Sequence, residues 1–518
     1  MTADRTDALP TPASAGTIDP DALTPGSLGA GIFRDRPVSV LGFARSGVAL
    51  ARFLAGAGAA VTVYDGRPAA ELGRAIEAVD GLPVRLLLGP EIDPADAIMG
   101  AALVTTSPSI NPAYPTTEPR LRRVLADLVA RRDDDDAAAP AIVSEVDLFL
   151  RLCPAATVGV TGTKGKTTTS ALTHALLATD AEHPAVLGGN IGVPLVERLP
   201  ELTPRHRVVL ELSELQLPTL SRGTTVAAYT NVTADHLDRH GSLEAYRAVK
   251  RRLAELVDPT GALVLNADDP IVAGYDIATR ARVVRYRRGE LPRGGLGVGH
   301  GWIVADEIAR LAGGASAGGR IMPVGELGVP GAHNVSNALA ATAVALLFGI
   351  APEAIRRAAG AFTGVEHRLE WVAEVDGVRF INDSQGTQPD AVIAALRAFD
   401  GPIVLIAGGR DKGVDLSELA GVVAKRAGAA VLIGESGPAL ERLFRGAGLL
   451  AIERAASLED AVEAADALAR AAHHRTGATA TVLLSPAAAS FDMFADYEAR
   501  GRAFKAAVAR LAGAAEGG

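Results

Sequence analysis

Short apolar runs alternate with longer amphipathic stretches over most of the chain, a pattern that predicts alternating strands and helices. The runs that begin at Val38, Thr157 and Ile403 each lead into a glycine-containing turn. This order is typical of an α/β protein with mainly parallel sheets. Residues 283–330 break the pattern, because they are rich in glycine and hold only short β-like pieces. We expect them to form a small antiparallel meander beside a parallel sheet.

The chain has 518 residues, which is too long for a single hydrophobic core. We expect three α/β domains: a Rossmann-like N-terminal domain at 31–152, a central P-loop ATPase-like domain with a mainly parallel sheet at 153–361, and a Rossmann-like C-terminal domain at 362–518. Residues 1–30 are rich in Thr, Pro, Ala, Gly and Asp and lack the apolar segment of a signal peptide. We interpret them as a disordered tail.

Composition excludes several classes of function. The net charge of −9 and the absence of a basic, aromatic-laced stripe argue against nucleic-acid binding. The longest apolar run, at 338–350, is shorter than the ~20 residues needed to cross a bilayer, so it predicts a buried helix rather than membrane insertion. A single cysteine, Cys153, cannot form an internal disulfide and indicates a reducing cytoplasm. We expect a buried thiol there rather than a reactive one.

A buried strand that ends with Val158 and Val160 leads into a glycine-rich loop and then a helix. Gly162 and Gly165 let the backbone approach a ligand closely, while Lys166 and Thr167 open the helix. This order suits a polyphosphate, because backbone N–H groups face the anion, the lysine pairs with phosphate oxygens and the threonine can ligate Mg²⁺. Val160 replaces the first glycine of the usual pattern, so the loop is a variant. A turn without any ligand is less favoured, because strand, loop, Lys-Thr pair and helix occur together.

Residues 38–65 combine a strand, a glycine turn, a helix and a second strand that ends in an acid, which resembles half of a dinucleotide-binding unit. The turn has the form G-x-x-x-x-G rather than G-x-G-x-x-G, so NAD is not favoured. Arg45 and Ser46 lie in the turn, and Asp65 and Arg67 follow the second strand, where a nucleotide would bind. An α/β domain with an empty crevice is the alternative for this segment.

Three further residues carry candidate chemistry. Glu211 is in an apolar strand, His236 in a polar loop and Lys250 on an amphipathic helix. Each has an ordinary structural interpretation: an acid paired across a sheet, a hydrogen-bonded loop residue and a solvated charge. A carboxylate at a strand end can also hold Mg²⁺ on nucleotide phosphates. Together with the phosphate loop, the three favour a nucleotide-dependent enzyme.

Ordered motifs make the chain similar to the Mur ligase family. Five of them occur at 161–168, 188–192, 211–217, 231–239 and 331–337. Three more, at 366–370, 382–384 and 485–492, narrow the resemblance to the members that add glutamate to UDP-N-acetylmuramoyl-L-alanine. The resemblance runs from about residue 38 to 512. It implies a cytoplasmic step of peptidoglycan synthesis in which ATP phosphorylates the alanine carboxylate, the glutamate amine attacks the acyl phosphate, and ADP and phosphate leave.

The resemblance also implies binding and catalytic residues. The ATP-binding residues would be Gly162, Thr163, Lys164, Gly165, Lys166, Thr167, Thr168, Asn334, Asn337, Arg368 and Asp383. The catalytic residues would be Lys166, Glu211, His236, Lys250 and Arg368. Two Mg²⁺ ions are implied, one held by Thr167 and Glu211, the other by His236 and a carbamylated Lys250.

Two substrates are implied as partners, bound by a chain that we expect to be a monomer. The UDP-sugar residues would be Arg45, Ser46, Asp65, Arg67, Asn190 and His236. The glutamate residues would be Gln385, Thr387, Lys412, Ser490, Phe491 and Tyr497. Closure of the third domain would bring Arg368 and Lys412 over the ATP site.

Two departures from the family pattern leave the reaction class intact but affect the expected recognition of glutamate. Gln385 stands where many glutamate-adding members have lysine, and Ser109 replaces a usual glycine. Gln385 leaves open whether the substrate is D- or L-glutamate, since an amide binds a carboxylate less strongly than an ammonium does. A sibling ligase with another amino acid or a folate substrate also stays possible, as does a non-catalytic nucleotide-binding relative. A relative without activity should have lost the phosphate-loop lysine, Glu211, His236 or Lys250, and this chain has lost none of them.

Overall fold

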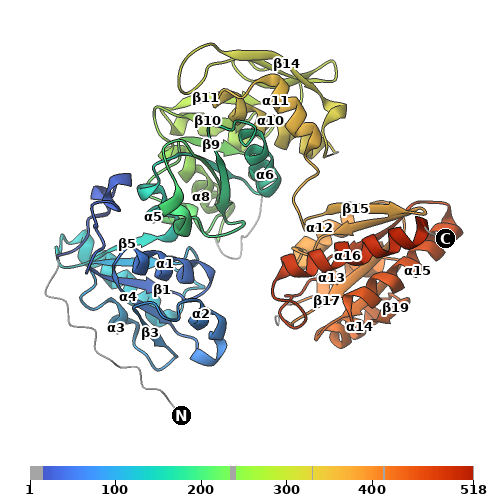
Figure 1. The fold of residues 1–518 in the computed structure, drawn as a ribbon, viewed down its shortest axis with the longest axis horizontal. Coiled ribbons are helices and arrows are strands. Elements are labelled where there is room, and N and C mark those ends of the chain that lie inside the picture. Colours follow the sequence, from blue (N-terminus) through green and yellow to red (C-terminus); the bar gives the residue numbers. More distant parts are fainter. Residues whose placement is uncertain (1–15, 234–240, 330, 412–414, 517–518) are drawn as a thin grey trace. The chain divides into compact units, whose positions relative to one another are not determined.

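The computed structural model describes residues 16–233, 241–329, 331–411 and 415–516. The chain forms two compact units, Met1–Phe362 and Thr363–Gly518, coloured blue to yellow and orange to red in Figure 1. Helices and mainly parallel sheets alternate in both, and the sheets number three among the described residues. The predicted α/β class is therefore confirmed. The limits of the three domains stay a prediction.

The first sheet is parallel and has the strand order β3-β2-β1-β4-β5. Its strands are β1 Pro37–Leu41, β2 Ala60–Asp65, β3 Val84–Leu88, β4 Leu103–Thr106 and β5 Ala141–Ser144. Its helices are α1 Arg45–Gly56, α2 Gly73–Ala78, α3 Pro94–Ile98, α4 Pro119–Asp133 and α5 Glu145–Leu152. The strand order reverses between β1 and β4, and ligands of open α/β sheets bind at the carboxyl ends beside such a reversal.

Residues 16–30 correct the prediction of a disordered tail. They contain short 3-10 helices at Pro20–Ala22 and Pro25–Ser27. Ile18 and Leu23 are buried in the core of the first sheet, and the Ile18 N–H donates to the Ala102 carbonyl at 2.8 Å. Isolated apolar residues among proline and glycine show no helical or strand period, so the sequence pattern did not reveal that they anchor this segment. Residues 1–15 lie outside the described part.

The second sheet has nine strands in the order β14-β13-β12-β11-β10-β9-β6-β8-β7. The parallel strands are β6 Ala156–Thr161, β7 Ala185–Gly189, β8 Arg207–Glu211, β9 Val226–Tyr229, β10 Ala262–Asn266 and β11 Arg282–Tyr286; β12 Leu296–Gly299, β13 Trp302–Ile308 and β14 Ala317–Pro323 form the antiparallel part. The expected meander is thus an extension of the main sheet. The first predicted piece of the meander, which begins at Val283, belongs to β11 and is parallel to β10. The prediction of an antiparallel strand there was wrong, because a short apolar run does not reveal the direction in which it pairs.

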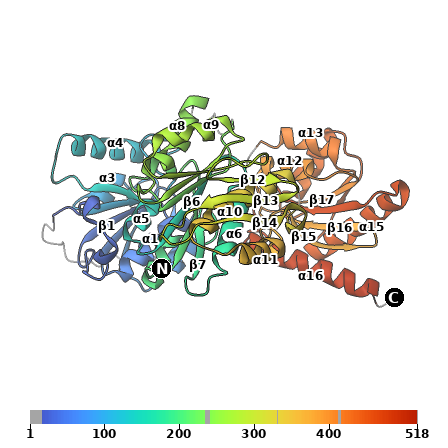
Figure 2. The same ribbon diagram turned by 90° about the horizontal axis from the view of Figure 1, so that it is seen from above.

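Helices cover both faces of the second sheet. They are α6 Lys166–Leu177, α8 Leu243–Leu256, α9 Pro270–Ala273, α10 Ala332–Leu347 and α11 Pro352–Ala361. Figures 1 and 2 both show α6 beside α10, and the two helices pack together over one hydrophobic core. The apolar run at 338–350 is a buried helix, as predicted. In the described part of the chain, no helix is long and apolar enough to cross a membrane.

The opposite face of the second sheet shares a core with the first sheet. Val38 and Val61 of the first sheet lie in the same buried cluster as Val208 and Leu263 of the second. This continuous core, which also includes α5 residues, explains why the first two sheets form one compact unit.

The third sheet has the order β15-β16-β20-β17-β18-β19 and is parallel except for β15. Its strands are β15 Glu370–Val375, β16 Val378–Asn382, β17 Ile403–Gly408, β18 Ala429–Ile433, β19 Ile452–Arg454 and β20 Ala480–Leu484. A hairpin turn joins β15 to β16 with positive φ at Asp376 (47°) and Gly377 (76°). One face is covered by α12 Pro389–Arg397, α13 Ser417–Arg426 and α14 Gly437–Gly446, the other by α15 Leu458–Thr476 and α16 Tyr497–Glu516.

A buried aspartate joins the first sheet to the second. Asp147 on α5 is 3% exposed, and its carboxylate accepts hydrogen bonds from the Ser221 N–H (2.7 Å), the Ser221 hydroxyl (2.7 Å) and the Arg222 N–H (3.1 Å). It also accepts from Arg151 Nε at 2.9 Å, and Arg151 reaches Asp21 Oδ1 at 3.1 Å. This network links the N-terminal segment, α5 and the loop after β8.

We therefore expect Asp147→Ala to lower the free energy of unfolding by about 3–5 kcal/mol, because it leaves a buried guanidinium without its main partner. The measurement is urea unfolding of the full chain. Asp21→Ala is the matched control: it removes the other carboxylate that contacts Arg151, but its side chain is 88% exposed, so a loss of at most about 1 kcal/mol is expected. Equal losses for the two variants would contradict the prediction.

Candidate active site

The loop between β6 and α6 has the geometry of a phosphate-binding loop. Gly162 (φ 146°) and Gly165 (φ 85°) take conformations that side chains disfavour. A Cβ on Gly162 would lie 2.0 Å from Thr230 Oγ1, and one on Gly165 would lie 2.5 Å from Asn337 Oδ1. Lys166 Nζ donates to the carbonyls of Gly162 (3.1 Å) and Thr163 (2.9 Å), so the lysine lies over the loop. The positive φ angles and the close approach of Thr230 and Asn337 together require glycine at positions 162 and 165.

Residues after β9 hold this loop in place. The Asn231 side chain accepts from the Lys164 N–H at 2.9 Å and donates to the Lys164 carbonyl at 2.9 Å. The Thr163 N–H donates to the Asn231 carbonyl at 2.7 Å, and Thr230 Oγ1 donates to the Lys164 carbonyl at 2.6 Å. Sequence patterns gave Thr230 and Asn231 no role. Their position at the end of a strand that pairs with β6 was the signal that could have identified them.

Glu211 ends β8, whose pairing with β6 places it opposite Val160. Its side chain is 2% exposed; Oε1 accepts from Asn190 Nδ2 at 3.1 Å, while Oε2 is buried without a hydrogen-bond partner among the described residues. A buried carboxylate oxygen without a partner is costly. A hard cation bound there would remove that cost, so these residues fit a Mg²⁺ site beside the phosphate loop.

Lys250 on α8 lies directly against the same loop. Its side chain is fully buried, and Nζ donates to the Gly162 carbonyl at 3.0 Å and, at 3.5 Å, to Thr161 Oγ1. The ammonium nitrogen also lies 5.5 Å from the centre of the Tyr246 ring. The structure thus excludes a solvated charge at this position. His236, the other predicted ligand of the second ion, lies outside the described residues.

The start of α10 completes this side of the loop. Asn337 is buried, and its Nδ2 donates to Asn334 Oδ1 at 3.1 Å. Since Asn337 lies against Gly165, both asparagines are close to the phosphate loop. Thr167, in the first turn of α6, is buried, and Thr168 is half-buried. The predicted residues of the central region that the structure describes therefore gather around one loop.

The predicted UDP residues surround the N-terminus of α1. Arg45 donates from a guanidinium nitrogen to the Gly192 carbonyl at 2.9 Å, which connects the turn to the loop that carries Asn190. Asp65 accepts from the Phe43 N–H (2.8 Å) and from Arg67 Nε (3.0 Å). Burial acts to raise the pKa of Asp65, but the hydrogen bonds from Arg67 and the backbone outweigh it and hold the pKa below its usual value. The Asp65 carboxylate thus fixes both the turn and the arginine. Ser46 is half-buried in the first turn of α1.

A cavity of about 340 Å³ lies beside this turn, with Gly42, Asp65, Ser109 and Glu118 in its walls. Leu215, which follows β8, closes it from the second sheet, and the Tyr114 hydroxyl donates to the Leu215 carbonyl at 2.8 Å. This cavity is at the carboxyl ends of β1 and β2, where the fold predicts a ligand.

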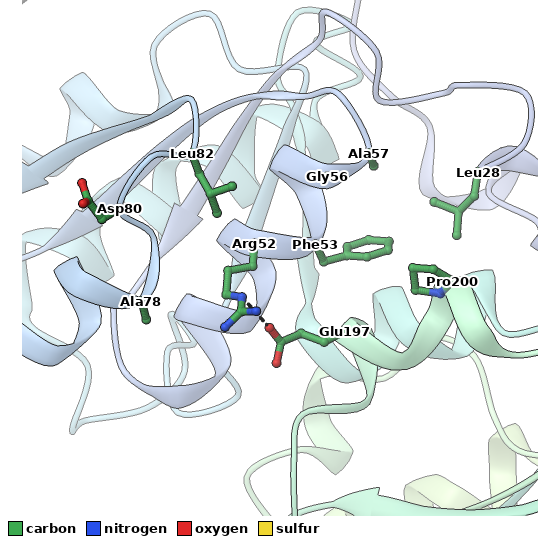
Figure 3. A pocket seen from close by; sticks show the side chains of 10 residues that line it. All are labelled: Leu28, Arg52, Phe53, Gly56, Ala57, Ala78, Asp80, Leu82, Glu197 and Pro200. Atoms are coloured by element: carbon green, nitrogen blue, oxygen red, sulfur yellow. Dashed lines mark ion pairs between the residues drawn. The ribbon is translucent and has the colours of Figure 1, made fainter.

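Another cavity, of about 700 Å³, lies at the opposite end of α1, between that helix and the 3-10 helix η4 Leu195–Glu201 (Figure 3). Arg52 and Glu197, which both line it, form an ion pair with 3.0 Å between Arg52 Nε and Glu197 Oε1. In the described part of the chain, no side chain that lines it has a buried polar atom without a partner. We assign no ligand to it.

In the second unit, Asp383 follows β16 and is 4% exposed. Its carboxylate accepts from the Ser485 hydroxyl at 2.6 Å and the Leu369 N–H at 3.2 Å. Burial raises the pKa of Asp383 to about 6. Arg368 is exposed between His367 (φ 62°) and Leu369 (φ 46°), and its positive charge acts to lower the pKa of Asp383 against the effect of burial.

The predicted glutamate residues lie on backbone segments that contact one another within this unit. The Ser384 hydroxyl donates to the Tyr497 carbonyl at 2.8 Å, and Arg500 donates to the carbonyls of Ser384 (2.9 Å) and Ala488 (3.3 Å). These contacts bring together the segments that carry Gln385, Thr387, Ser490, Phe491 and Tyr497. Lys412 lies outside the described residues.

Arg500 is a buried residue that holds the segments of this region together and that sequence patterns missed. It is 1% exposed, and burial lowers its pKa to about 10. An arginine on an amphipathic C-terminal helix gives no sequence signal that distinguishes it from a solvated one. Gln385, in the same region, has a buried Oε1 without a partner among the described residues.

Comparison with known proteins agrees with this geometry. A family model described as "Mur ligase middle domain" matches residues 160–345, and one described as "Mur ligase, glutamate ligase domain" matches residues 367–488. A UDP-N-acetylmuramoylalanine--D-glutamate ligase from Symbiobacterium thermophilum is 37% identical over 93% of this chain and 100% of its own. The enzyme of the same name from Roseiflexus sp. is 39% identical over 90% of this chain and 96% of its own. The chain belongs to the Mur ligase family.

Solved structures of other Mur ligases are more distant from this one. The match to the structure of UDP-N-acetylmuramate-alanine ligase from Thermotoga maritima covers 92% of this chain and 99% of that chain, with 18% sequence identity and a TM-score of 0.49. A pseudomurein peptide ligase type C from Methanothermus fervidus covers 92% of this chain and 100% of its own, with 19% identity and a TM-score of 0.47.

The raised pKa of Asp383 in this Mur ligase makes a prediction about stability. A carboxyl group with a folded pKa near 6 and an unfolded pKa near 3.8 is ionised at neutral pH at a cost to the folded state. We therefore expect Asp383→Asn to raise the free energy of unfolding by about 2 kcal/mol at pH 7.5. The gain should decrease as the pH falls below 6 and vanish near pH 3, below the pKa of the carboxyl group in both states. Thermal unfolding over this pH range is the measurement.

Asp415→Asn is the control for that series. Asp415 is exposed and its pKa is lowered by hydrogen bonds from the Ser417 hydroxyl and N–H, so its removal should give no gain. A gain for Asp383→Asn that persists undiminished at pH 3 would show that burial of the charge is not the cause.

Proposed function

We propose that this Mur ligase uses ATP to join D-glutamate to UDP-N-acetylmuramoyl-L-alanine through an acyl phosphate, with release of ADP and phosphate. The reaction is a step of peptidoglycan precursor synthesis, and hence of cell-wall formation. Relatives that carry this activity in their names match nearly the whole chain. The observation that carries the mechanism is Glu211, a buried acid with an unpartnered oxygen one strand away from a phosphate loop.

The chain's own residues explain how the first step is catalysed. A carboxylate is a poor electrophile at neutral pH, so it must first receive a phosphoryl group that can leave. The N–H groups of the loop and the N-terminus of α6 bind and orient the ATP phosphates, and Lys166 neutralises part of their charge. Mg²⁺ held by Thr167 and Glu211 would supply further positive charge for phosphoryl transfer. We assign Asn334 and Asn337, which lie beside the loop at Gly165, to the adenine side of ATP.

Lys250 has a second role in this proposal. We infer that its buried amine is carbamylated and, with His236, holds a second Mg²⁺. Carbamylation would convert the lysine cation into an anionic oxygen ligand. The position of Lys250, buried beneath the phosphate loop, is one in which such a ligand could hold an ion.

The two substrates are assigned to separate parts of the chain. Arg45, Ser46 and Arg67 bind the UDP moiety, with Asp65 as their support, and Asn190 and His236 the muramoyl side. The C-terminal unit binds glutamate through Gln385, Thr387, Lys412, Ser490, Phe491 and Tyr497, while Arg368 and Asp383 contact ATP. Each chain carries every one of these residues, so a monomer suffices. The lone Cys153, buried and with a thiol pKa raised by burial to about 11, agrees with action in the cytoplasm.

The same ligation with L-glutamate is a second candidate that Gln385 alone raises, since the relatives are named as D-glutamate ligases. Gln385 replaces a lysine of many glutamate-adding members, and a neutral amide binds a carboxylate less strongly.

The deciding experiment measures phosphate release with ATP, Mg²⁺ and UDP-N-acetylmuramoyl-L-alanine, with D-glutamate and L-glutamate supplied separately. Turnover that depends on D-glutamate supports the proposal. Preference for L-glutamate would establish the second candidate, and no turnover with either amino acid would refute both.

A further inference from the structure

One buried acid of the first unit has no role in the proposed reaction. Glu145 is the first residue of α5, directly after β5 of the first sheet, and is 4% exposed. Its carboxylate accepts a hydrogen bond from the N–H of Val196, which belongs to η4 and follows β7 of the second sheet. Val196 is fully buried in the core that the two sheets share. Glu145 therefore joins the first sheet to the second from inside the protein.

The loop between β7 and η4, which Glu145 holds at its far end, also contacts the candidate active site. At its start, the Asn190 N–H donates to the Glu211 carbonyl at 2.9 Å, and Asn190 Nδ2 donates to Glu211 Oε1 at 3.1 Å. In its middle, the Gly192 carbonyl accepts from Arg45 at 2.9 Å. One short loop thus connects Glu145 to two residues assigned to the UDP-sugar and to the acid beside the phosphate loop.

The charges that act on Glu145 come from two other helices. They are Arg45 at the start of α1 and Glu197 of η4. β5 and the second N-terminal 3-10 helix, both among the described residues, also pack on α5 and have no titratable side chain. On α5 itself, Asp147 and Arg151 pair with each other at 2.9 Å. Arg45 is therefore the cation that balances an ionised Glu145.

Burial raises the pKa of Glu145 to about 7. The Val196 N–H and the charge of Arg45 act against this rise, and the charge of Glu197 adds to it. Glu145 is thus divided between its neutral and ionised forms at neutral pH. A nearby cation stabilises a buried carboxylate, and a nearby anion destabilises it. A diphosphate bound at Arg45 would neutralise the guanidinium and add negative charge, so it would favour the neutral form of Glu145.

We propose that Glu145 is a positioning residue for the UDP-sugar and takes up a proton when the diphosphate of that substrate binds at Arg45. The inference rests on the proposed function, which assigns Arg45 to the UDP moiety. In the free protein, the ionised carboxylate competes with the diphosphate for the charge of Arg45. In the complex, a proton from solvent is bound to one carboxylate oxygen, and the other oxygen keeps the hydrogen bond from the Val196 N–H. The loop is therefore held in both forms, and no bond of the substrate changes.

Binding of UDP-N-acetylmuramoyl-L-alanine should weaken as the pH rises. Glu145 has a higher pKa in the complex than in the free protein, so protonation favours the complex and this advantage is lost as the pH rises through the two values. We expect the Kd to be about 3- to 7-fold higher at pH 8.5 than at pH 6. The phosphates and the carboxylate of the substrate stay ionised over this range, so the change belongs to the protein.

The test is calorimetric titration of the full chain with this substrate, without ATP or Mg²⁺, in HEPES and in Tris at pH 7.5. The two buffers release a proton with different enthalpies, so the difference between the binding heats gives the number of protons taken up. Glu145→Gln keeps the size of the side chain and an acceptor for the Val196 N–H, but it cannot titrate. Wild type should take up about 0.3–0.5 proton more than this variant. At pH 8.5 the variant should bind about 3- to 7-fold more tightly than wild type, which loss of a merely structural contact would not produce.

Two further variants complete the experiment. Glu201→Gln is the matched control, because Glu201 is an exposed acid of η4 that pairs with Arg198 at 2.7 Å. It should take up protons and respond to pH as wild type does. Glu197→Gln removes the like charge that acts on Glu145, so the midpoint of the pH dependence should move to lower pH.

Equal proton uptake by wild type and Glu145→Gln would overturn the inference. It would also be overturned if Glu145→Gln bound more weakly at every pH and kept the pH dependence of wild type, since the residue would then be structural alone. If Glu145→Gln does not fold, the midpoint in Glu197→Gln decides: a shift to lower pH supports the inference and an unchanged midpoint overturns it. In each of these cases the substrate still binds, whereas a wild-type chain that does not bind it at any pH would refute the proposed function.

Discussion

Glu211→Gln should lower kcat for ligation about 10³-fold, since metal charge at a transferring phosphoryl group supplies several kcal/mol and each 1.36 kcal/mol is a factor of ten. The change keeps the shape of the side chain but removes its charge and one of its acceptor oxygens. The oxygen affected is buried, with no partner among the described residues. Phosphate release measured over a range of Mg²⁺ concentrations is the readout. We expect the Mg²⁺ requirement to rise as kcat falls, with UDP binding unchanged.

Glu197→Gln is the matched control for that experiment. Glu197 belongs to the same unit, but its carboxylate is half-buried and pairs with Arg52 at 3.0 Å, away from the phosphate loop. The Glu197→Gln protein should have the same kcat and the same Mg²⁺ requirement as the wild-type chain. A Glu211→Gln protein with a lower kcat but an unchanged Mg²⁺ requirement would show that the carboxylate does not hold the metal.

Sequence patterns predicted the strand ends and the phosphate loop because each depends on neighbouring residues. The period of apolar positions identifies a strand, and the glycines at 162 and 165 mark a turn that only glycine adopts easily. The partners of that loop could not be predicted in this way. Glu211 lies beside it because β8 pairs with β6, and Lys250 lies beneath it because α8 packs on that sheet. Only the resemblance to a family connected them beforehand.

Residues that depart from their usual environment were the hardest to predict. Lys250 and Arg500 are charged residues on amphipathic helices, which are solvated in most proteins. Both are buried here because backbone carbonyls receive their hydrogen bonds: Gly162 for the lysine, Ser384 and Ala488 for the arginine. Ile18 shows the opposite case, a single apolar residue in a polar segment that is buried by tertiary packing. A local period cannot reveal contacts of this kind.

Lys250→Ala is expected to lower the ligation rate about 10³-fold, and short carboxylic acids are expected to restore part of it. If the amine is carbamylated, the variant loses an anionic oxygen ligand and gains a cavity beneath the phosphate loop, because Lys250 is fully buried there. Formate, acetate or propionate at millimolar concentration can enter that space and supply the missing oxygen. A recovery of at least about tenfold is expected, which corresponds to 1.36 kcal/mol of the barrier. Phosphate release with and without each acid is the measurement.

The control for this experiment is the next residue on the same helix. Arg251 is exposed and pairs with Glu255 at 2.8 Å, so Arg251→Ala should keep full activity and show no response to the acids. Two outcomes would remove the carbamate: full activity of Lys250→Ala, or a loss that no acid restores. The second would leave Lys250 as a support for the loop, since its ammonium donates to the Gly162 carbonyl. Lys250→Arg distinguishes these roles further, because arginine can hydrogen-bond that carbonyl but cannot form the carbamate, so a support role predicts activity above that of Lys250→Ala and a ligand role does not.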